Sequence, residues 1–311
     1  MLAGLKKDIP KMGARGRERT YSERVTSAVT GGDLEELKIL LDKPGVDHIN
    51  ALGHAALHEA ACWGNLKAID FILRLKGDIN VKSSGGCTPL ALAVDHNQEE
   101  AVNLLLSRGA SPDESDAKGV TPLMKAAEAG AAGIVASLVT HNAALEKKDG
   151  EGRTALMAAA QKGQAMIVGA LAGRGAALTV TDNEGNTVMH YAVTCQENDV
   201  MLQFLAEKDR GLLNRPNKVG ETPAIVAVKR SQPENLQTLL NLGADPAIPD
   251  NSGKNAVDHG RTLKRAKFRT AMKEVMENEG EAARQHMRRG TEEKISVRKP
   301  LRLKKTASFT S

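Results

Sequence analysis

The feature of this sequence that most constrains its fold is a glycine that recurs every 33 residues, with one interval of 35. The series is Gly53, Gly86, Gly119, Gly152, Gly185, Gly220 and Gly253. Two residues after most of these glycines comes a threonine (Thr88, Thr121, Thr154, Thr187 and Thr222), with a proline next at Pro89, Pro122 and Pro223. Self-similarity over six periods indicates an array of stacked structural repeats.

Within each period the residues predict two short helices joined by turns. Threonine is a favoured N-cap, and proline is tolerated at the first helical position because the N–H that it lacks has no helical partner there. A first helix through small residues follows, and a second helix such as 99–107 repeats its leucines at helical spacing. Helices of about ten residues are marginal alone, so stacking must supply the burial. Because aromatic residues make up only 2% of the chain, we expect a core of Leu, Ala, Val, Ile and Met.

The segments GVTPLMKAAEAGAAGIVASLVTHNAAL and GCTPLALAVDHNQEEAVNLLLSRGASP resemble the ankyrin repeat, whose pattern includes T-P-L-H-x-A. The resemblance implies an all-α repeat solenoid of stacked helix-turn-helix repeats with β-hairpin fingers. The pattern is not kept in every repeat. Ala55-Ala56 replaces Thr-Pro in one, Val188 replaces the proline in another, and Asn255-Ala256 replaces both residues in the last.

The same register divides the chain into an arm, a repeat domain and a tail. Residues 1–21 are predicted to be a basic, disordered N-terminal arm, 22–280 an ankyrin repeat domain, and 281–311 a basic disordered tail. Within the domain, 22–52 is the expected N-terminal cap, repeats start at 53, 86, 119, 152, 185 and 220, and 253–280 is the expected C-terminal cap. Two extra residues in the fifth repeat predict a lengthened finger or loop at 209–217.

The stretch GHAALHEAACWG, residues 53–64, also resembles a metal site. His54, His58 and Cys62 stand four residues apart, and on a single helix this spacing would place three zinc-competent side chains on one face. In the repeat register, however, His58 falls at the histidine of the ankyrin pattern, which in that family makes local hydrogen bonds, and His54 precedes the helix. We therefore expect no metal and no cofactor, and metal binding by these residues is the alternative.

No known catalytic motif occurs in the printed sequence: it lacks a G-K-[ST] phosphate loop, a G-x-S-x-G elbow and a paired Cys/His constellation. The three cysteines are far apart, which favours a reducing compartment. No run of 18 apolar residues is present, and the N-terminus lacks the apolar core of a signal peptide. We expect a non-enzymatic, cytoplasmic or nuclear protein with no small-molecule substrate.

Stacked repeats commonly bind partners through the concave face made by their fingers and first helices. The ankyrin resemblance places the partner-facing positions at His54, Glu59, Trp63, Leu92, Asp95, His96, Lys125, Glu128, Arg153, Lys162, Tyr191 and Arg230. Trp63, the only tryptophan, is the expected hot spot, and partial packing against a neighbouring finger is the alternative. The predicted function is that of a protein-protein interaction adaptor or scaffold.

The basic tail suggests a second class of function. Residues 261–311 hold 15 basic and 6 acidic residues, whereas 26–260 hold 21 basic and 29 acidic. Clusters at 288–289 and 298–305 resemble a bipartite nuclear import signal, and Thr306 and Ser308 follow them at positions that basophilic kinases prefer. A nuclear import receptor or a kinase would then bind the tail, and a merely solubilising role is the alternative.

The segment 261–278 reads as a basic amphipathic helix. We expect its apolar face to cap the last repeat, and binding to calmodulin or to an anionic membrane is the alternative. The competing function for the whole chain is therefore a regulator that associates with an anionic membrane or nucleic acid through its basic C-terminal tail. A chain with so few aromatic residues lacks a stacking platform for bases, which favours the adaptor.

Overall fold

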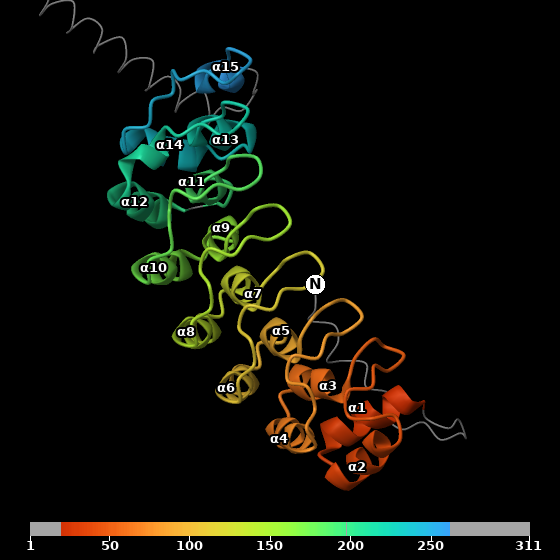
Figure 1. Ribbon diagram of the computed structural model, residues 1–311. Helices are drawn as coiled ribbons and strands as arrows, with labels where there is room; N and C mark the ends of the chain where they lie inside the picture. The colour runs from red at the N-terminus through yellow and green to blue at the C-terminus, as the bar shows by residue number, and fades with distance from the viewer. Residues whose placement is uncertain (1–19, 197, 262–311) are drawn as a thin grey trace, which may run out of the picture. The chain divides into compact units, whose positions relative to one another are not determined.

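A computed structural model of the chain describes residues 20–196 and 198–261 (Figure 1). These residues form two compact units, 20–183 and 184–261, and the regular structure in both is helical with no strand. The expected arm up to residue 19, the C-terminal cap beyond residue 261, and the tail with its import signal and the phosphorylation candidates Thr306 and Ser308 lie outside the described residues.

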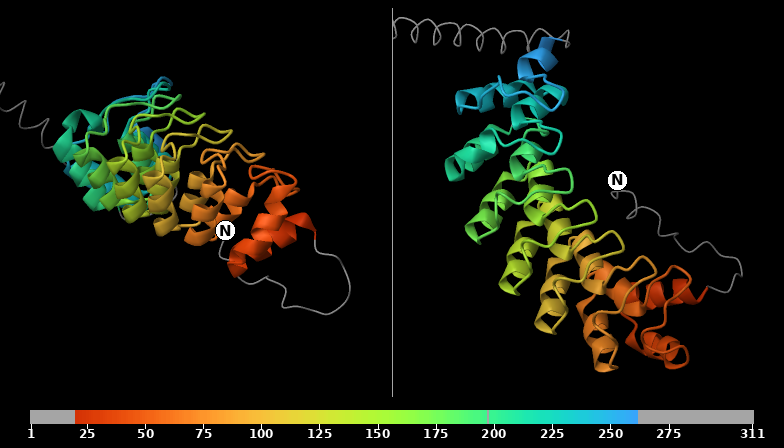
Figure 2. Two further views of the ribbon diagram at one scale, coloured as in Figure 1. Left: turned by 60° about the horizontal axis from the view of Figure 1, so that its bottom comes forward. Right: turned by 45° about the horizontal axis from the view of Figure 1, so that its top comes forward.

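The first unit is built from pairs of short helices. Its first helices are α1 (Tyr21–Gly31), α3 (Ala56–Cys62), α5 (Pro89–Asp95), α7 (Pro122–Ala129) and α9 (Ala155–Gln161). Its second helices are α2 (Leu34–Asp42), α4 (Leu66–Arg74), α6 (Glu99–Ser107), α8 (Ala132–Thr140) and α10 (Ala165–Gly173). From α3 onward, each first helix contacts the next first helix and each second helix contacts the next second helix, which gives two rows (Figures 1 and 2). The fingers before the first helices project to one side of these rows (Figure 2).

The second unit repeats this arrangement with one addition. It contains α11 (Val188–Ala192), α12 (Asp199–Lys208), the 3-10 helix η1 (Arg210–Leu213), α13 (Pro223–Lys229), α14 (Pro233–Asn241) and α15 (Ala256–Arg261). The segment predicted as a lengthened loop, 209–217, therefore includes η1. The side chains of Leu212 and Leu213 are buried, and Arg210 donates a hydrogen bond to the Leu242 carbonyl at 3.1 Å. The segment 209–217 thus contributes two buried side chains to the core, and Arg210 binds the backbone at the end of α14.

Small residues allow the first helices to pack closely. The fully buried alanines of the first unit are Ala55, Ala60, Ala61, Ala68, Ala93, Ala101, Ala126, Ala127, Ala159 and Ala160. Both rows supply larger buried side chains, such as Leu57, Leu90 and Leu123 on the first helices and Ile72, Leu105 and Leu138 on the second helices. An aromatic-poor chain can therefore fill its core at normal density with thin layers of helix.

Most first helices begin at the predicted threonine caps. Thr88 accepts a hydrogen bond from the backbone N–H of Ala91 at 3.2 Å, and the threonines at 121, 154 and 222 cap in the same way. Ala55 has no side chain that can do this, so the only cap contact at α3 is the His58 Nδ1 atom, which accepts the Ala55 N–H at 3.1 Å. At α15, Asn255 replaces the threonine and accepts from the Asp258 N–H at 2.9 Å.

The fingers are closed turns, and the predicted β-hairpins are not confirmed. In the finger that begins at Asn50, the Asn50 N–H donates to the His54 carbonyl at 2.8 Å and the Gly53 N–H donates to the Asn50 carbonyl at 2.9 Å. Neighbouring fingers are joined by one backbone hydrogen bond, such as Ser84 N–H to the Gly53 carbonyl at 2.9 Å. The two backbone bonds within a finger and the single backbone bond between fingers do not extend into the ladder that defines a strand pair.

The recurring glycines satisfy two demands of these fingers. Gly152 has φ +81°, a left-handed conformation that other residues adopt only at a cost. A Cβ atom on Gly152 would also lie 2.7 Å from the backbone nitrogen of Asn183 in the next finger. The spacing of 33 residues is therefore the distance along the chain between points where consecutive fingers touch.

A second series of hydrogen bonds joins the turns after the second helices. The Asp78 N–H donates to the Asp47 carboxylate at 2.9 Å, and the Ser111 N–H donates to the Asn80 side chain at the same distance. Equivalent bonds run from the N–H groups of residues 144, 177 and 245 to the side chains of residues 113, 146 and 214. Consecutive repeats are thus held together at both ends of each helix pair.

The missing cap of α3 predicts a stabilising substitution. We expect Ala55→Thr to raise the free energy of unfolding by about 0.5–1 kcal/mol, because the Thr187 hydroxyl lies 2.9 Å from the Nδ1 atom of His190 and a threonine at 55 could make the same hydrogen bond to His58. The reverse change, Thr88→Ala, should lower it by about 1 kcal/mol. Urea denaturation followed by circular dichroism measures both, and a destabilised Ala55→Thr variant would show that the site is too tightly packed for a cap.

A pair of glycine substitutions separates the cost of the left-handed backbone conformation from the cost of a clash between fingers. Gly109 has φ +90° with open space around its Cβ position, so Gly109→Ala should cost only the left-handed conformation, about 1–2 kcal/mol. Gly152→Ala adds a clash with the next finger and should cost at least about 1 kcal/mol more. Equal losses in thermal or urea denaturation would contradict the close approach as a cause.

Candidate protein-binding surface

The residues predicted to face a partner lie in both units. His54, Glu59, Trp63, Leu92, Asp95, His96, Lys125, Glu128, Arg153 and Lys162 belong to the first unit, and Tyr191 and Arg230 to the second. In the first unit they lie in the fingers, along the first helices and at the ends of these helices. The structure therefore brings the first ten onto successive repeats of one unit.

An ion pair joins two of these residues across adjacent repeats. The Lys125 ammonium on α7 lies 2.7 Å from the Asp95 carboxylate at the end of α5 and 3.6 Å from the Asp116 carboxylate in the intervening finger. Burial opposes the charged form of Lys125, but the hydrogen bond to Asp95 and the two carboxylates outweigh it and raise the pKa of Lys125. The Lys125 side chain is only 15% exposed, so its charge lies mostly below the surface and is held in position by the two carboxylates.

Two further pairs lie farther along the same unit. Lys162, which follows α9, is 2.9 Å from Glu128 on α7, and both side chains are about half exposed. Arg153 is bound within its own repeat: its Nε atom donates to Asp149 in the finger at 2.8 Å, and its Nη1 atom donates to Gln161 at the end of α9 at 3.1 Å. The surface therefore presents alternating charges that are already paired between or within repeats.

Glu59 differs from the prediction, because its side chain is buried. Glu59 is 6% exposed; its Oε1 atom lies 3.0 Å from the Nδ1 atom of His54, and its Oε2 atom accepts from the Thr26 hydroxyl at 3.4 Å. The small residues around α3 leave room for this inward position. Glu59 is therefore placed to orient His54, whose ring is partly exposed, and is not itself available for direct contact with a partner.

His58 makes the local hydrogen bonds that the ankyrin resemblance implies. It is fully buried, its Nδ1 atom accepts from Ala55, and its Nε2 atom lies 2.9 Å from the Cys87 carbonyl in the next finger. These partners require a neutral ring protonated at Nε2. The ring of His54 stacks on it at 5.6 Å between centroids.

The remaining predicted residues differ in exposure. His96 and Arg230 are exposed at the ends of α5 and α13, whereas Leu92 on α5 and Tyr191 on α11 are partly buried. Leu92 and Tyr191 therefore contribute part of their side chains to the helix packing and part to the surface.

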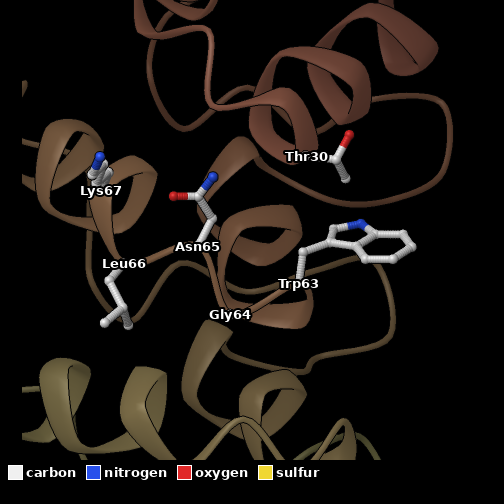
Figure 3. Close-up of a pocket in the computed structure, with 6 residues that line it drawn as sticks. All are labelled: Thr30, Trp63, Gly64, Asn65, Leu66 and Lys67. Atoms are coloured by element: carbon white, nitrogen blue, oxygen red, sulfur yellow. The ribbon is translucent and has the colours of Figure 1, made fainter.

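Trp63 stands at the edge of a hollow that the sequence did not predict. The hollow has a volume of about 390 Å³ and is lined by Thr30, Trp63, Gly64, Asn65, Leu66 and Lys67 (Figure 3). The side chain of Trp63 is on the surface, with 37% of the residue exposed, and Leu66 is 39% exposed. Leu66 and Lys67 were missed because they lie at the start of the second helix α4, whereas the predicted positions were in the fingers and first helices. Their signal in the sequence was an apolar residue at a position where the next repeat has Glu99.

The cysteines and acidic residues show no metal centre in the part of the chain that the structure describes. No group of three or more His, Cys, Asp or Glu side chains is arranged there to hold a metal ion. Burial, together with the carboxylates of Glu59 and Asp95, raises the pKa of Cys62 to about 11, so its thiol is protonated at neutral pH. None of the helices in residues 20–196 and 198–261 is both long and apolar enough to span a bilayer.

Comparison with known proteins identifies the repeats. The sequence matches the family model for ankyrin repeats in three copies, over residues 25–116, 109–182 and 167–250. Among solved structures, the human ASB11 ankyrin repeat domain superimposes with a TM-score of 0.61 at 21% identity, covering 70% of this chain and 96% of that domain. At this identity the likeness to ASB11 shows the fold alone.

Curated relatives match over part of their length. Protein phosphatase 1 regulatory subunit 27 of Mus musculus is 36% identical over 84 residues, which are 26% of this chain and 54% of the mouse protein. The probable E3 ubiquitin-protein ligase XBOS33 of Oryza sativa subsp. japonica is 34% identical over 87 residues, which are 27% of this chain and 17% of the rice protein. The matched region thus spans about half the length of the mouse relative.

The burial of His58 predicts a pH-dependent stability. Burial, assisted by the neighbouring His54, lowers the pKa of His58 below its ordinary value of 6.5. Because the unfolded chain then binds more protons than the folded one, this contribution is complete above about pH 6.5 and is lost as the pH falls. We expect the free energy of unfolding to decrease from pH 7 to pH 5, and to decrease less in His58→Gln. The exposed His141→Gln is the matched control, and equal slopes for all three proteins would contradict the prediction.

Proposed function

The chain belongs to the ankyrin repeat family, and on that premise we propose that it is a non-enzymatic adaptor or scaffold that binds a protein partner through the fingers and first helices of its repeats. The observation that carries the proposal is the row of charged and aromatic side chains on successive repeats of the first unit, from His54 to Lys162. Hydrogen bonds between repeats hold this row in place before any partner binds, so little ordering entropy opposes association.

The ion pairs on this surface support a role in specificity. Glu128 and Lys162 are each about half exposed, so a partner's charges can bind them without the full desolvation cost of a buried pair. Asp95 and Lys125 are more enclosed and hold the pattern in position. We propose that Glu59 has only a positioning role, through its contact with His54.

The names of the relatives are consistent with protein binding as the role of the aligned repeats, but they do not identify the partner of this chain. Their names include a phosphatase regulatory subunit and a ubiquitin ligase, so the aligned repeats occur in proteins of different activity. The name of the mouse relative makes the catalytic subunit of protein phosphatase 1 the first partner to test with this chain. We also propose that the protein acts in the cytoplasm or nucleus, with its basic tail as a separate determinant of location.

The central test exchanges the charges of one pair while keeping the pair itself. In the double variant Glu128→Lys/Lys162→Glu the ion pair is preserved in reverse, so the fold should be retained while the surface pattern presented to a partner changes. We expect the full-length variant to bind its partner roughly tenfold or more weakly than the wild type, because like charges then face each other. Quantitative affinity capture finds the partners, and titration with purified protein phosphatase 1 catalytic subunit tests the first candidate.

The matched control is Glu100→Lys, an exposed charge reversal on the second helix α6. At least one protein should be retained by the wild type and by Glu100→Lys and lost by the exchanged pair. Identical capture by all three proteins would overturn the proposed surface. Loss of every partner on truncation after residue 260, with no effect of the exchange, would instead favour the alternative in which the basic tail binds nucleic acid or an anionic membrane.

A further inference from the structure

The hollow beside Trp63 has a composition that the repeat fold does not require. In the other repeats of the first unit, the residues equivalent to Trp63 are Gly31, His96, Ala129 and Lys162. Those equivalent to Leu66 are Leu34, Glu99, Ala132 and Ala165, and those equivalent to Lys67 are Glu35, Glu100, Gly133 and Met166. The other repeats fold without an exposed aromatic ring, an exposed leucine and a lysine together, so the fold does not require this combination.

The turn that carries Trp63 is held rigidly from both sides. The Asn65 amide donates to the Val29 carbonyl of the preceding repeat at 2.5 Å, and its oxygen caps α4 by accepting from Ala68 at 3.0 Å. From the following repeat, Gln98 donates to the Cys62 carbonyl at 3.1 Å. Gly64 has φ +68°, and a Cβ atom there would lie 2.5 Å from the Gln98 side-chain oxygen. The hollow is therefore formed before a ligand arrives.

Apolar surface and hydrogen-bond donors line the hollow. Figure 3 shows the Trp63 indole beneath the Thr30 side chain, with Asn65 between Trp63 and Lys67. Within residues 20–196 and 198–261, neither the Trp63 indole N–H nor the Lys67 ammonium has a protein partner. The first turn of α4, which contains Leu66 and Lys67, adds the partial positive charge of a helix N-terminus.

Two neighbouring carboxylates, one on α4 and one at the equivalent position of the next repeat, are directed to other groups. Asp70 on α4 pairs with Arg108 and Arg74, each at 2.5 Å. The Glu99 carboxylate lies against Gly133 in the following repeat. None of the six residues that line the hollow is acidic. The site thus has two exposed donors, one of them cationic, beside two exposed apolar side chains in a shallow, open hollow.

We propose that this hollow binds an acidic peptide segment of a protein partner. The peptide lies extended across the hollow: its apolar side chain packs against Trp63, its backbone crosses Leu66, one carboxylate accepts from the indole N–H, and a separate carboxylate pairs with Lys67 on the far side of Asn65. Charge complementarity selects an acidic segment over a basic one, and the rigid turn allows a short segment to bind. The inference rests on the proposed function, since it gives the class of partner that this part of the surface recognises.

Trp63 is the only tryptophan in the sequence, so its fluorescence reports binding at the hollow. The probes are acetylated, amidated nonapeptides without tryptophan, each with one Leu or Phe flanked by glutamates, and a matched series with glutamine in place of glutamate. Titrated into the full-length protein, the glutamate peptides should give a saturable change in Trp63 emission. The glutamine series should bind roughly tenfold more weakly, because it loses the charge pair with Lys67.

Two lysine variants test the assigned contact. Lys67→Glu should weaken binding of the glutamate peptides roughly tenfold or more, whereas Lys118→Glu, at an exposed finger tip, should bind them as the wild type does. Leu66→Ala should reduce affinity for both peptide series. Circular dichroism confirms that each variant is folded.

Absence of a saturable emission change with any glutamate peptide would overturn the inference, as would equal binding by Lys67→Glu and the wild type. The proposed function is tested separately, because the exchanged pair Glu128→Lys/Lys162→Glu does not alter the hollow. Partners that depend on that pair, together with no peptide binding, would overturn the acidic peptide alone. Peptide binding without any effect of the exchanged pair would overturn the proposed surface alone.

Discussion

The contact between consecutive fingers is the constraint on which the rest of the structure depends. At Gly152 the backbone of the next finger approaches so closely that a methyl group would collide with the Asn183 nitrogen. This approach brings the fingers within reach of a backbone hydrogen bond, such as Ser84 to Gly53 at 2.9 Å. Together with the side-chain bonds between the turns at the other end, it sets the spacing of the helix rows, and buried alanines then fill that spacing.

The same spacing organises the surface. Repeats placed at a constant separation bring Asp95 to Lys125 and Glu128 to Lys162, so charges that are more than 29 residues apart in the sequence become pairs. A residue's exposure then depends on what the neighbouring repeat offers it. Glu59 is buried and contacts Thr26 and His54. Trp63 lies on the surface beside Thr30, where both line the hollow.

Much of the fold followed from the sequence, and the candidate site followed in part. The periodic glycines and threonines are needed locally, for the turns and for the helix N-caps. The first helices begin where these residues predicted. The predicted β-hairpin fingers came from the family pattern, and the predicted lengthened finger or loop at 209–217 came from counting residues. Neither source shows that a finger makes too few ladder bonds to form a strand, or that Leu212 and Leu213 are buried. The predicted partner-facing residues lie mostly on the surface, but Glu59 does not.

The sequence by itself determined the repeat, its length, and the caps and turns that begin and end most of its helices, because these depend on the backbone conformation of single residues and their near neighbours. Only the tertiary structure decided which charges are paired, which way Glu59 points, and that Thr30, Trp63, Leu66 and Lys67 line one hollow. The physical reason is that these interactions join residues of different helices and repeats, which come within contact distance only after the repeats have stacked.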